Sequence, residues 1–282
     1  MVTGRRVGVA SAAALLLVTG CRAGPAETSP APDPDPTATL GFTQLLPNEG
    51  TRHALLRVTN TGDAAMVVTS VAIEWPGYPD GAPSPADPTI PAGSTLDIQL
   101  DLPDPACAPS GSEDVIGVVE TEHGTVRHEL EATGTTYVRR LWRTQCEDVV
   151  VQSAVAISYS DTWQVVGDGV EARALGDLVL QRRDGDDLIS VGGVDGSVLH
   201  GLRLPGPTTL PAGSALARIP LEITPGNRCD EHARGQATAP FDFLMRLRIG
   251  DRPAIAYAIE VPLTAMEAAT EALDVACRAR EG

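Results

Sequence analysis

The sequence predicts an all-β protein of two tandem immunoglobulin-like β-sandwich domains with short helices. Three observations lead to this prediction: one segment is repeated, short strand-like runs are separated by turn residues, and the cysteines divide evenly between the two halves. Residues 1–20 are predicted as a signal peptide, 21–39 as a tether, 40–147 as the first domain and 148–282 as the second.

The repeat consists of two similar segments, residues 89–107 and residues 209–229. Both segments carry Thr-Ile/Leu-Pro-Ala-Gly-Ser, then a strand-like stretch, then a proline-bearing loop that ends at Cys107 or Cys229. A single Pro-Ala-Gly-Ser turn is weak evidence. Two copies 120 residues apart, each followed by a cysteine, indicate tandem domains built on one plan.

Strand-like runs rich in β-branched residues recur through both halves, with turn residues between them. The first two runs, 54–59 and 65–73, are predicted to form a hairpin across the turn that begins at Asn60. Helix is the minority element: a capping-box pattern from Thr264 to Glu267 opens an alanine-rich stretch to residue 276, and 137–145 is a second candidate. The remaining predicted strands are 95–102, 115–120, 125–131, 149–159, 172–182, 197–204, 216–223, 241–249 and 254–261.

The N-terminus, MVTGRRVGVASAAALLLVTGC, has two arginines, an apolar run from Val7 to Val18 and then Thr-Gly-Cys. It resembles a bacterial lipobox. The resemblance implies cleavage before Cys21, a diacylglyceryl group on Cys21 and a membrane anchor at the extracytoplasmic face. A plain secretory signal, a twin-arginine signal and a membrane-spanning helix are the alternatives, although the apolar run is short for a span.

The tether, residues 22–39, contains five prolines and no apolar residue larger than alanine, a composition typical of an unfolded spacer. Removal of residues 1–20 changes the formal net charge from −16 to −18, because only two arginines are lost. This acidity argues against nucleic-acid binding. All 21 basic residues are arginine, so mechanisms that need a lysine are excluded.

Besides Cys21, the chain has four cysteines: Cys107, Cys146, Cys229 and Cys277. In an exported protein these are expected to form disulfides. Three connectivities are possible. The repeat favours Cys107–Cys146 and Cys229–Cys277, because each bond then ties the loop after a Pro-Ala-Gly-Ser strand to the end of its own domain. The spacings do not match those of a zinc site.

Four further features occur together: Cys146 after an arginine-containing helix, the run Asn-Arg-Cys-Asp-Glu-His-Ala at 227–233, the strand after it and a terminal helix near Cys277. Together they resemble an uncharacterised group of actinobacterial secreted proteins and lipoproteins. Members of that group carry Arg-Cys-Asp-Pro-His-Ala at the matching place, whereas Glu231 replaces the proline here. The resemblance covers most of the mature chain by layout, and it implies a fold and no activity.

Two places are candidates for function. Asp230, Glu231 and His232 form the densest titratable cluster and are a possible ligand site, although a structural loop beside a disulfide explains them more simply. Trp75 and Tyr78 lie on a proline-rich loop and are candidate partner contacts, while capping of the sandwich edge is the structural alternative for Trp75. No known catalytic motif is present, and no metal or cofactor is expected.

We therefore expect a lipid-anchored, extracytoplasmic binding or scaffold protein of the cell envelope, not an enzyme, with an envelope protein as a possible partner. The alternative is a solute- or metal-binding lipoprotein that uses an interdomain cleft. A hydrolase would require a nucleophile and a histidine that meet only in the folded chain.

Overall fold

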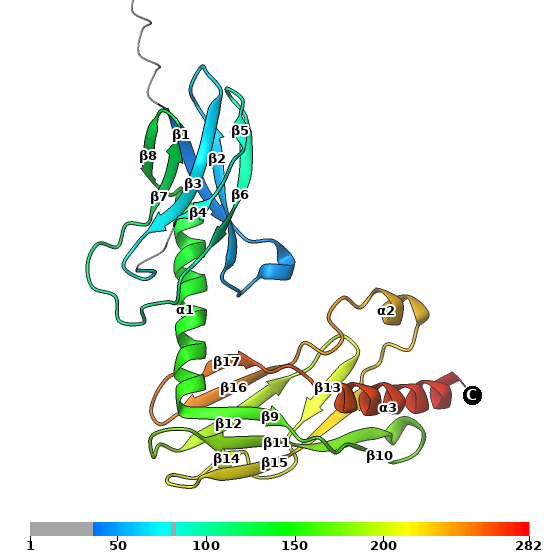
Figure 1. Ribbon diagram of the computed structural model, residues 1–282. Coiled ribbons are helices and arrows are strands. Elements are labelled where there is room, and N and C mark those ends of the chain that lie inside the picture. The colour runs from blue at the N-terminus through cyan, green and yellow to red at the C-terminus, as the bar shows by residue number, and fades with distance from the viewer. Residues whose placement is uncertain (1–35, 80–82, 282) are drawn as a thin grey trace, which may run out of the picture. The chain divides into compact units, whose positions relative to one another are not determined.

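The computed structural model describes residues 36–79 and 83–281 (Figure 1). The predictions made for residues 1–35, including the signal peptide and lipidation of Cys21, lie outside this part of the chain. No helix within it is long and apolar enough to span a membrane.

The first half is a sandwich of two antiparallel sheets that enclose one apolar core. Leu40, Leu56 and Val58 from one sheet pack against Val68 and Val119 from the other. One sheet has the order β1-β2-β6 and contains β1 (Ala38–Thr43), β2 (His53–Asn60) and β6 (Thr95–Asp101). The other has the order β4-β3-β7-β8, with β5 also paired to β3, and contains β3 (Met66–Glu74), β4 (Ser84–Pro85), β5 (Thr89–Ile90), β7 (Ile116–Thr121) and β8 (Gly124–Glu129).

The second half repeats this architecture of two antiparallel sheets around an apolar core. Leu178, Leu180 and Ile219 from its first sheet pack against Ile189 and Leu247 from its second. The first sheet has the order β10-β11-β15-β13, with β9 also paired to β11, and contains β9 (Val155–Tyr159), β10 (Gln164–Val166), β11 (Arg173–Arg182), β13 (His200–Arg203) and β15 (Leu216–Pro225). The second has the order β14-β12-β16-β17 and contains β12 (Ile189–Asp195), β14 (Thr209–Leu210), β16 (Leu244–Ile249) and β17 (Ile255–Ala258).

The repeated Pro-Ala-Gly-Ser segments form the same turn in both halves. Gly93 and Gly213 have φ of 70° and 69°, and the amides of Ser94 and Ser214 donate to the carbonyls of Pro91 and Pro211 at 3.1 Å. Glycine is favoured there because a side chain makes positive φ costly. The repeat in sequence is therefore a repeat in structure.

Helix α1 (Ala132–Ala154) contributes side chains to both cores. Val138 and Leu141 are buried in the first core, and Val151 is buried in the second. The helix ends where Val155 becomes extended and begins β9, as Figure 1 shows. The predicted domain boundary between residues 147 and 148 falls inside this helix.

Helix α3 (Leu263–Glu281) closes the second sandwich with an alanine face. The buried Ala265, Ala269, Ala272 and Ala276 recur at helical spacing, and small side chains let a helix approach a sheet closely. The helix begins at Leu263, one residue before the predicted start, and extends beyond residue 276. The short helices α2 (Glu231–Gln236), η1 (Leu46–Asn48) and η2 (Gly169–Glu171) complete the fold.

Both predicted disulfides are confirmed. Cys107 is bonded to Cys146 and Cys229 to Cys277, with Cα–Cα distances of 5.4 Å in each case. One bond fastens the loop after β6 to α1, and the other fastens the loop after β15 to α3. The predicted all-β class, with one disulfide in each half, is confirmed as well.

Three local predictions were wrong. Residues 149–154, predicted as strand, belong to α1, because burial of Val151 in the second core outweighs the strand preference of three consecutive valines. Residues 38 and 39, predicted as tether, lie in β1. The predicted hairpin of 54–59 with 65–73 does not form, because β2 pairs with β1 and β6 while β3 joins the other sheet.

Asn60 directs the chain from one sheet to the other at that turn. Its buried side chain donates hydrogen bonds to the carbonyls of Ala64 and Ile90 and accepts one from the amide of Gly62. The hairpins β7–β8 and β16–β17 form as antiparallel pairs.

His200 is 2% exposed and packs between Phe241 and Phe243, with ring centroids at 5.0 and 6.4 Å. Its Nδ1 atom has no hydrogen-bond partner in the described part of the chain. Burial lowers the pKa of its imidazole from 6.5 to about 4, because the charged form loses its hydration.

We predict that replacement of Leu141 with alanine lowers the free energy of unfolding by about 3 kcal/mol, since it leaves a cavity in the first core. Val149→Ala on the same helix is the control. Val149 is 47% exposed, so its loss is expected to cost under about 0.5 kcal/mol. Urea denaturation of both variants measures the difference, and equal losses would show that α1 does not contribute to the core as described.

We also predict that His200 makes the fold sensitive to mild acid. The unfolded chain binds a proton at this residue below about pH 6.5, while the folded chain resists protonation until about pH 4, so stability falls as the pH falls through that window. Between pH 7.5 and pH 5 the wild type is expected to lose about 2 kcal/mol more than His200→Phe. Urea titrations at both pH values test this, and parallel losses in the two proteins would refute it.

Candidate functional site

The part of the first sandwich that the structure describes is hollowed at two places beside α1. The first, which we call the polar hollow, is a cavity of about 710 Å³ between the ends of β2 and β6 and the C-terminal half of α1. Its lining includes Arg52, His53 and Asp101 from the sandwich and Gln145 and Asp148 from α1.

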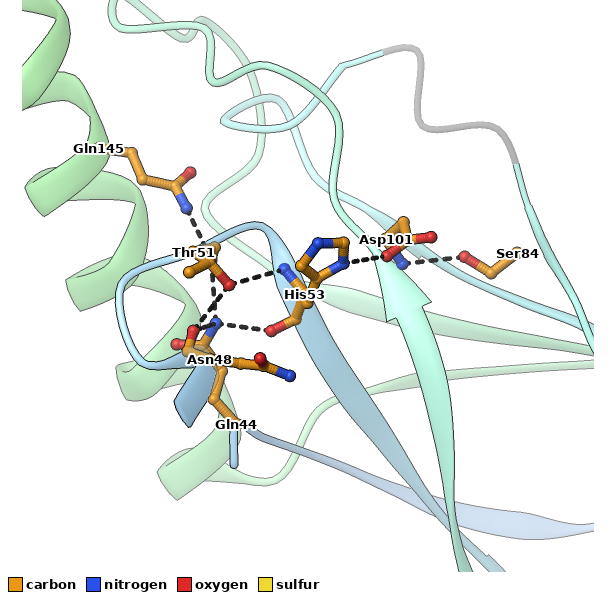
Figure 2. Close-up of polar contacts among 7 residues, drawn as sticks. All are labelled: Gln44, Asn48, Thr51, His53, Ser84, Asp101 and Gln145. Carbon is orange, nitrogen blue, oxygen red and sulfur yellow. Dashed lines mark hydrogen bonds and ion pairs between the residues drawn. The ribbon is translucent and has the colours of Figure 1, made fainter. Parts of the chain in front are cut away.

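Side-chain amides organise the loop that forms the floor of the polar hollow (Figure 2). The Gln44 amide donates to the carbonyls of Asn48, Thr51 and His53 at 3.0, 2.9 and 2.8 Å. The Gln145 amide donates to the carbonyls of Thr51 and Gly50 at 3.1 and 3.4 Å. These side-chain amides thus satisfy backbone carbonyls of the loop, as neighbouring strands satisfy backbone carbonyls within a sheet.

His53 and Asp101 form the most prominent polar pair of this hollow. They are cross-strand partners on β2 and β6, and His53 Nδ1 lies 2.7 Å from Asp101 Oδ1. The Asp101 amide donates to Ser84 Oγ at 3.0 Å, so in Figure 2 the serine lies on the far side of Asp101 from the imidazole. A histidine and a carboxylate are therefore paired here, with Ser84 held away from the imidazole that would have to activate it.

The polar hollow is acidic. Arg52 pairs with Asp104 at 2.5 Å, while Asp148 makes no ion pair in the described part of the chain. Burial raises the pKa of the Asp148 carboxyl, and the charge of the neighbouring Glu147 raises it further. Among the described residues, no group of three or more His, Cys, Asp or Glu side chains is placed to hold a metal ion.

The second surface is centred on Trp75 and Pro76, which we call the Trp75 ridge. A hollow of about 310 Å³ lies on one side, lined by Pro109, Gly111, Ser112 and residues of α1. A hollow of about 500 Å³, lined by Ile73, Tyr78, Pro79, Asp114 and Ile116, lies on the other. Trp75, Pro76 and Ser112 line both hollows.

Aromatic packing fixes the ridge. The Trp75 ring meets Tyr78 and Trp142 edge-on, with centroids at 6.0 and 5.5 Å. The Trp142 indole N–H donates to the Ala106 carbonyl at 2.9 Å, next to the disulfide at Cys107. A Cβ atom at Gly77 would lie 2.0 Å from the Trp75 ring, so only glycine leaves room for this ring position.

Helix α1 carries three arginines, and they differ in their partners. Arg139 donates to the Glu113 carbonyl at 2.5 Å and lies 3.6 Å from the Glu113 carboxylate. Arg140 stacks over Tyr137 at 4.6 Å and pairs with Glu49 at 3.7 Å. Arg143 lines the smaller hollow, is exposed, and has no ion-pair partner within the residues that the structure describes.

The predicted contact pair, Trp75 and Tyr78, is brought together, but only Trp75 is available to a partner. Tyr78 is 1% exposed, and its hydroxyl donates to Gln145 Oε1 at 2.9 Å inside the core. The prediction of Tyr78 as a partner contact is therefore corrected. Burial also raises the pKa of its phenol. Sequence reasoning missed Trp142 and Arg143, although their spacing from Arg139 on the predicted helix places all three close together.

In the other candidate cluster, the structure gives Asp230 a local role. Asp230 is the N-cap of α2, and its carboxylate accepts a hydrogen bond from the Ala233 amide at 2.8 Å. That hydrogen bond and a second from Arg228 lower the pKa of Asp230. Glu231 is the first residue of α2, and His232 is exposed to solvent. The carboxylate of Asp230 thus has a local structural role beside the Cys229–Cys277 bond.

Comparisons with known proteins add little. No protein-family model and no curated protein matches the chain. Among solved structures, the BSP domain of a biofilm-associated protein is 10% identical with a TM-score of 0.22, over 80% of this chain and 58% of its own. A B domain of a biofilm-associated protein is 11% identical with a TM-score of 0.23, over 78% and 82%.

An exo-chitosanase of Amycolatopsis orientalis is 12% identical with a TM-score of 0.19, over 78% of this chain and 26% of its own. This chain thus spans less than two thirds of the biofilm BSP domain chain and of the chitosanase. At such TM-scores, these likenesses carry no argument about fold or function.

We predict that Gly77→Ala dislodges the Trp75 ring. The added methyl group has no room beneath the indole, and overpacking of this kind costs about 1–3 kcal/mol. Near-ultraviolet circular dichroism is expected to lose intensity, because the Trp75 and Trp142 rings no longer meet edge-on. Gly235→Ala, where a Cβ meets nothing within 4 Å, is the control. An unchanged aromatic spectrum in Gly77→Ala would contradict the fixed ridge.

Proposed function

We propose that the chain is a lipid-anchored binding or scaffold protein at the extracytoplasmic face of the cell membrane, and that it binds an envelope protein through the Trp75 ridge. It acts without a cofactor, does not bind nucleic acid and is not an enzyme. The membrane contact is made by the diacylglyceryl group on Cys21.

Three observations support the location. The N-terminal 21 residues have the pattern of a lipobox, and the proline-rich segment after Cys21 has the composition of a spacer. Two disulfides, one in each half, are typical of an oxidising, exported compartment. A formal charge of −18 after signal removal keeps the body of the protein soluble and away from anionic lipid.

The single observation that carries the binding role is the pair of hollows that share Trp75, Pro76 and Ser112. A partner segment laid over the ridge contacts a rigid aromatic ring and is enclosed on both sides. Tryptophan and arginine are the residues that most often dominate binding energy at protein interfaces. Because the ring is already fixed by Tyr78 and Trp142, little conformational entropy is lost on binding.

One observation favours the alternative of a solute-binding lipoprotein: the polar hollow has the volume of a small-molecule site. It lies between the first sandwich and α1, rather than in the interdomain cleft expected from the sequence. Substitutions at the two surfaces separate the two functions, since the polar hollow and the Trp75 ridge share no lining residue.

We predict that a photocrosslinking amino acid at Ser112 captures one discrete protein in intact cells, and that capture falls at least tenfold with Trp75→Leu or with Cys21→Ser. Cys21→Ser is also expected to move the protein from the membrane fraction to the soluble fraction. His53→Gln in the polar hollow is the control and leaves capture unchanged. Capture that survives loss of Trp75, or a chain that remains in the membrane fraction without Cys21, would refute the respective half of the proposal.

A further inference from the structure

We infer that the partner segment at the Trp75 ridge is an extended, proline-containing peptide whose carboxylate pairs with Arg143. The inference rests on the proposed function, because it specifies the chemistry of the partner at the same site. It goes beyond that function by naming the backbone form and the charge of the segment.

The charge argument starts from α1. Arg139 and Arg143 lie four residues apart on one helix face, where like charges repel each other, and both line the smaller hollow. Arg139 is compensated by Glu113. Arg143 is the member of this pair that has no ion-pair partner in the described part of the chain. A carboxylate delivered by a partner relieves the repulsion and meets a planar guanidinium whose N–H groups are free for a bidentate contact.

The walls of the smaller hollow indicate the second property of the partner. Trp75, Trp142, Pro76 and Pro109 present flat, rigid, apolar surfaces, against which a proline ring packs well. Trp75 makes no hydrogen bond through its indole N–H in the described part of the chain, and this nitrogen is not fully buried. It is therefore a free donor for a peptide carbonyl. A polyproline II segment exposes all of its carbonyls, because it has no internal hydrogen bonds.

The hollow of about 500 Å³ on the other side of Trp75 indicates which end of the bound segment carries the acidic residue. Its walls include Ile73, Ile116 and Tyr78, together with the carboxylate of Asp114, and its Glu74 is already paired with Arg127. A carboxylate of the partner is repelled there and attracted to Arg143, so the acidic residue lies over the smaller hollow and an apolar residue enters the larger one. An extended chain presents successive side chains far enough apart to reach both sides of a ridge, whereas a compact ligand occupies one hollow.

The test measures binding of fluorescent nine-residue peptides to the mature chain with Cys21→Ser, by anisotropy. The first peptide has proline at every third position and two aspartates. In the second, asparagine replaces aspartate, and in the third, glycine replaces proline. We expect the second and third peptides to bind at least tenfold more weakly than the first. Binding of the first peptide is expected to weaken as salt is raised, because the ion pair is exposed.

A charge-reversal variant of the protein tests the ion pair more directly than the peptide changes do. Arg143→Glu is expected to weaken binding of the aspartate peptide at least tenfold and to strengthen binding of a peptide with lysine at the same positions. Arg140→Glu is the matched control: the residue is on the same helix but already contacts Glu49 and Tyr137 and lines neither hollow. It changes the net charge equally and is expected to shift binding by less than twofold.

Three outcomes would overturn the inference: equal binding of the aspartate and asparagine peptides, equal effects of Arg143→Glu and Arg140→Glu, or binding of acidic oligosaccharides in place of the peptides. These outcomes differ from failure of the proposed function. If Ser112 captures a protein in cells but the aspartate and asparagine peptides bind equally, the envelope-binding role is retained and only the inferred chemistry of the partner is wrong. Absence of any Ser112 crosslink removes the role itself.

Discussion

The burial of one helix in two cores is the constraint on which the rest of the structure depends. Val138 and Leu141 of α1 complete the first core, and Val151 helps to complete the second. Neither sandwich can therefore release this helix without exposing apolar side chains of its own. The Cys107–Cys146 bond fastens the same helix to the loop after β6, which removes further freedom from the unfolded chain. Both hollowed surfaces of the first sandwich use this helix as a wall, so their shapes are set by the packing of the core beneath them.

The two surfaces differ in how many of their polar side chains already have hydrogen-bond or ion-pair partners. In the polar hollow, His53 is paired with Asp101, Arg52 with Asp104, and the loop carbonyls with Gln44 and Gln145. At the Trp75 ridge, the Trp75 indole N–H and the Arg143 guanidinium have no partner among the residues that the structure describes. The paired groups of the polar hollow gain little from a new ligand, because each new contact replaces an existing one. Asp148 is the charged lining residue of this hollow that has no ion pair in the described part of the chain. The ridge offers donors on a rigid frame, and this is why we propose the ridge, rather than the polar hollow, as the binding surface.

The sequence was sufficient for the features that local pattern determines. The repeated Pro-Ala-Gly-Ser turn, with its positive-φ glycine, located equivalent strands in the two halves, and the cysteine that follows each copy led to the correct disulfide pairing. It was insufficient where tertiary contacts decide. The valines at 149–151 have the pattern of a strand, and the core makes them helical. Asn60 looked like a hairpin turn, yet its buried amide carries the chain to the opposite sheet. Tyr78 beside Trp75 looked exposed, and only its distant partner Gln145 explains its burial.

That pairing of Tyr78 with Gln145 also explains why a polar side chain is kept at a buried position of α1. Gln145 is 8% exposed, and it lies four residues from Leu141 and seven from Val138, on the face that enters the core. Its carbonyl accepts from Tyr78, and its amide donates to the Gly50 and Thr51 carbonyls, so each of its polar atoms is satisfied. A leucine at this position would fill the space but leave a hydroxyl and two carbonyls without these partners. The apolar contacts of the helix tolerate small rotations, whereas these hydrogen bonds do not. Gln145 therefore sets the rotation of α1, and with it the positions of Trp142 and Arg143 beside the Trp75 ridge.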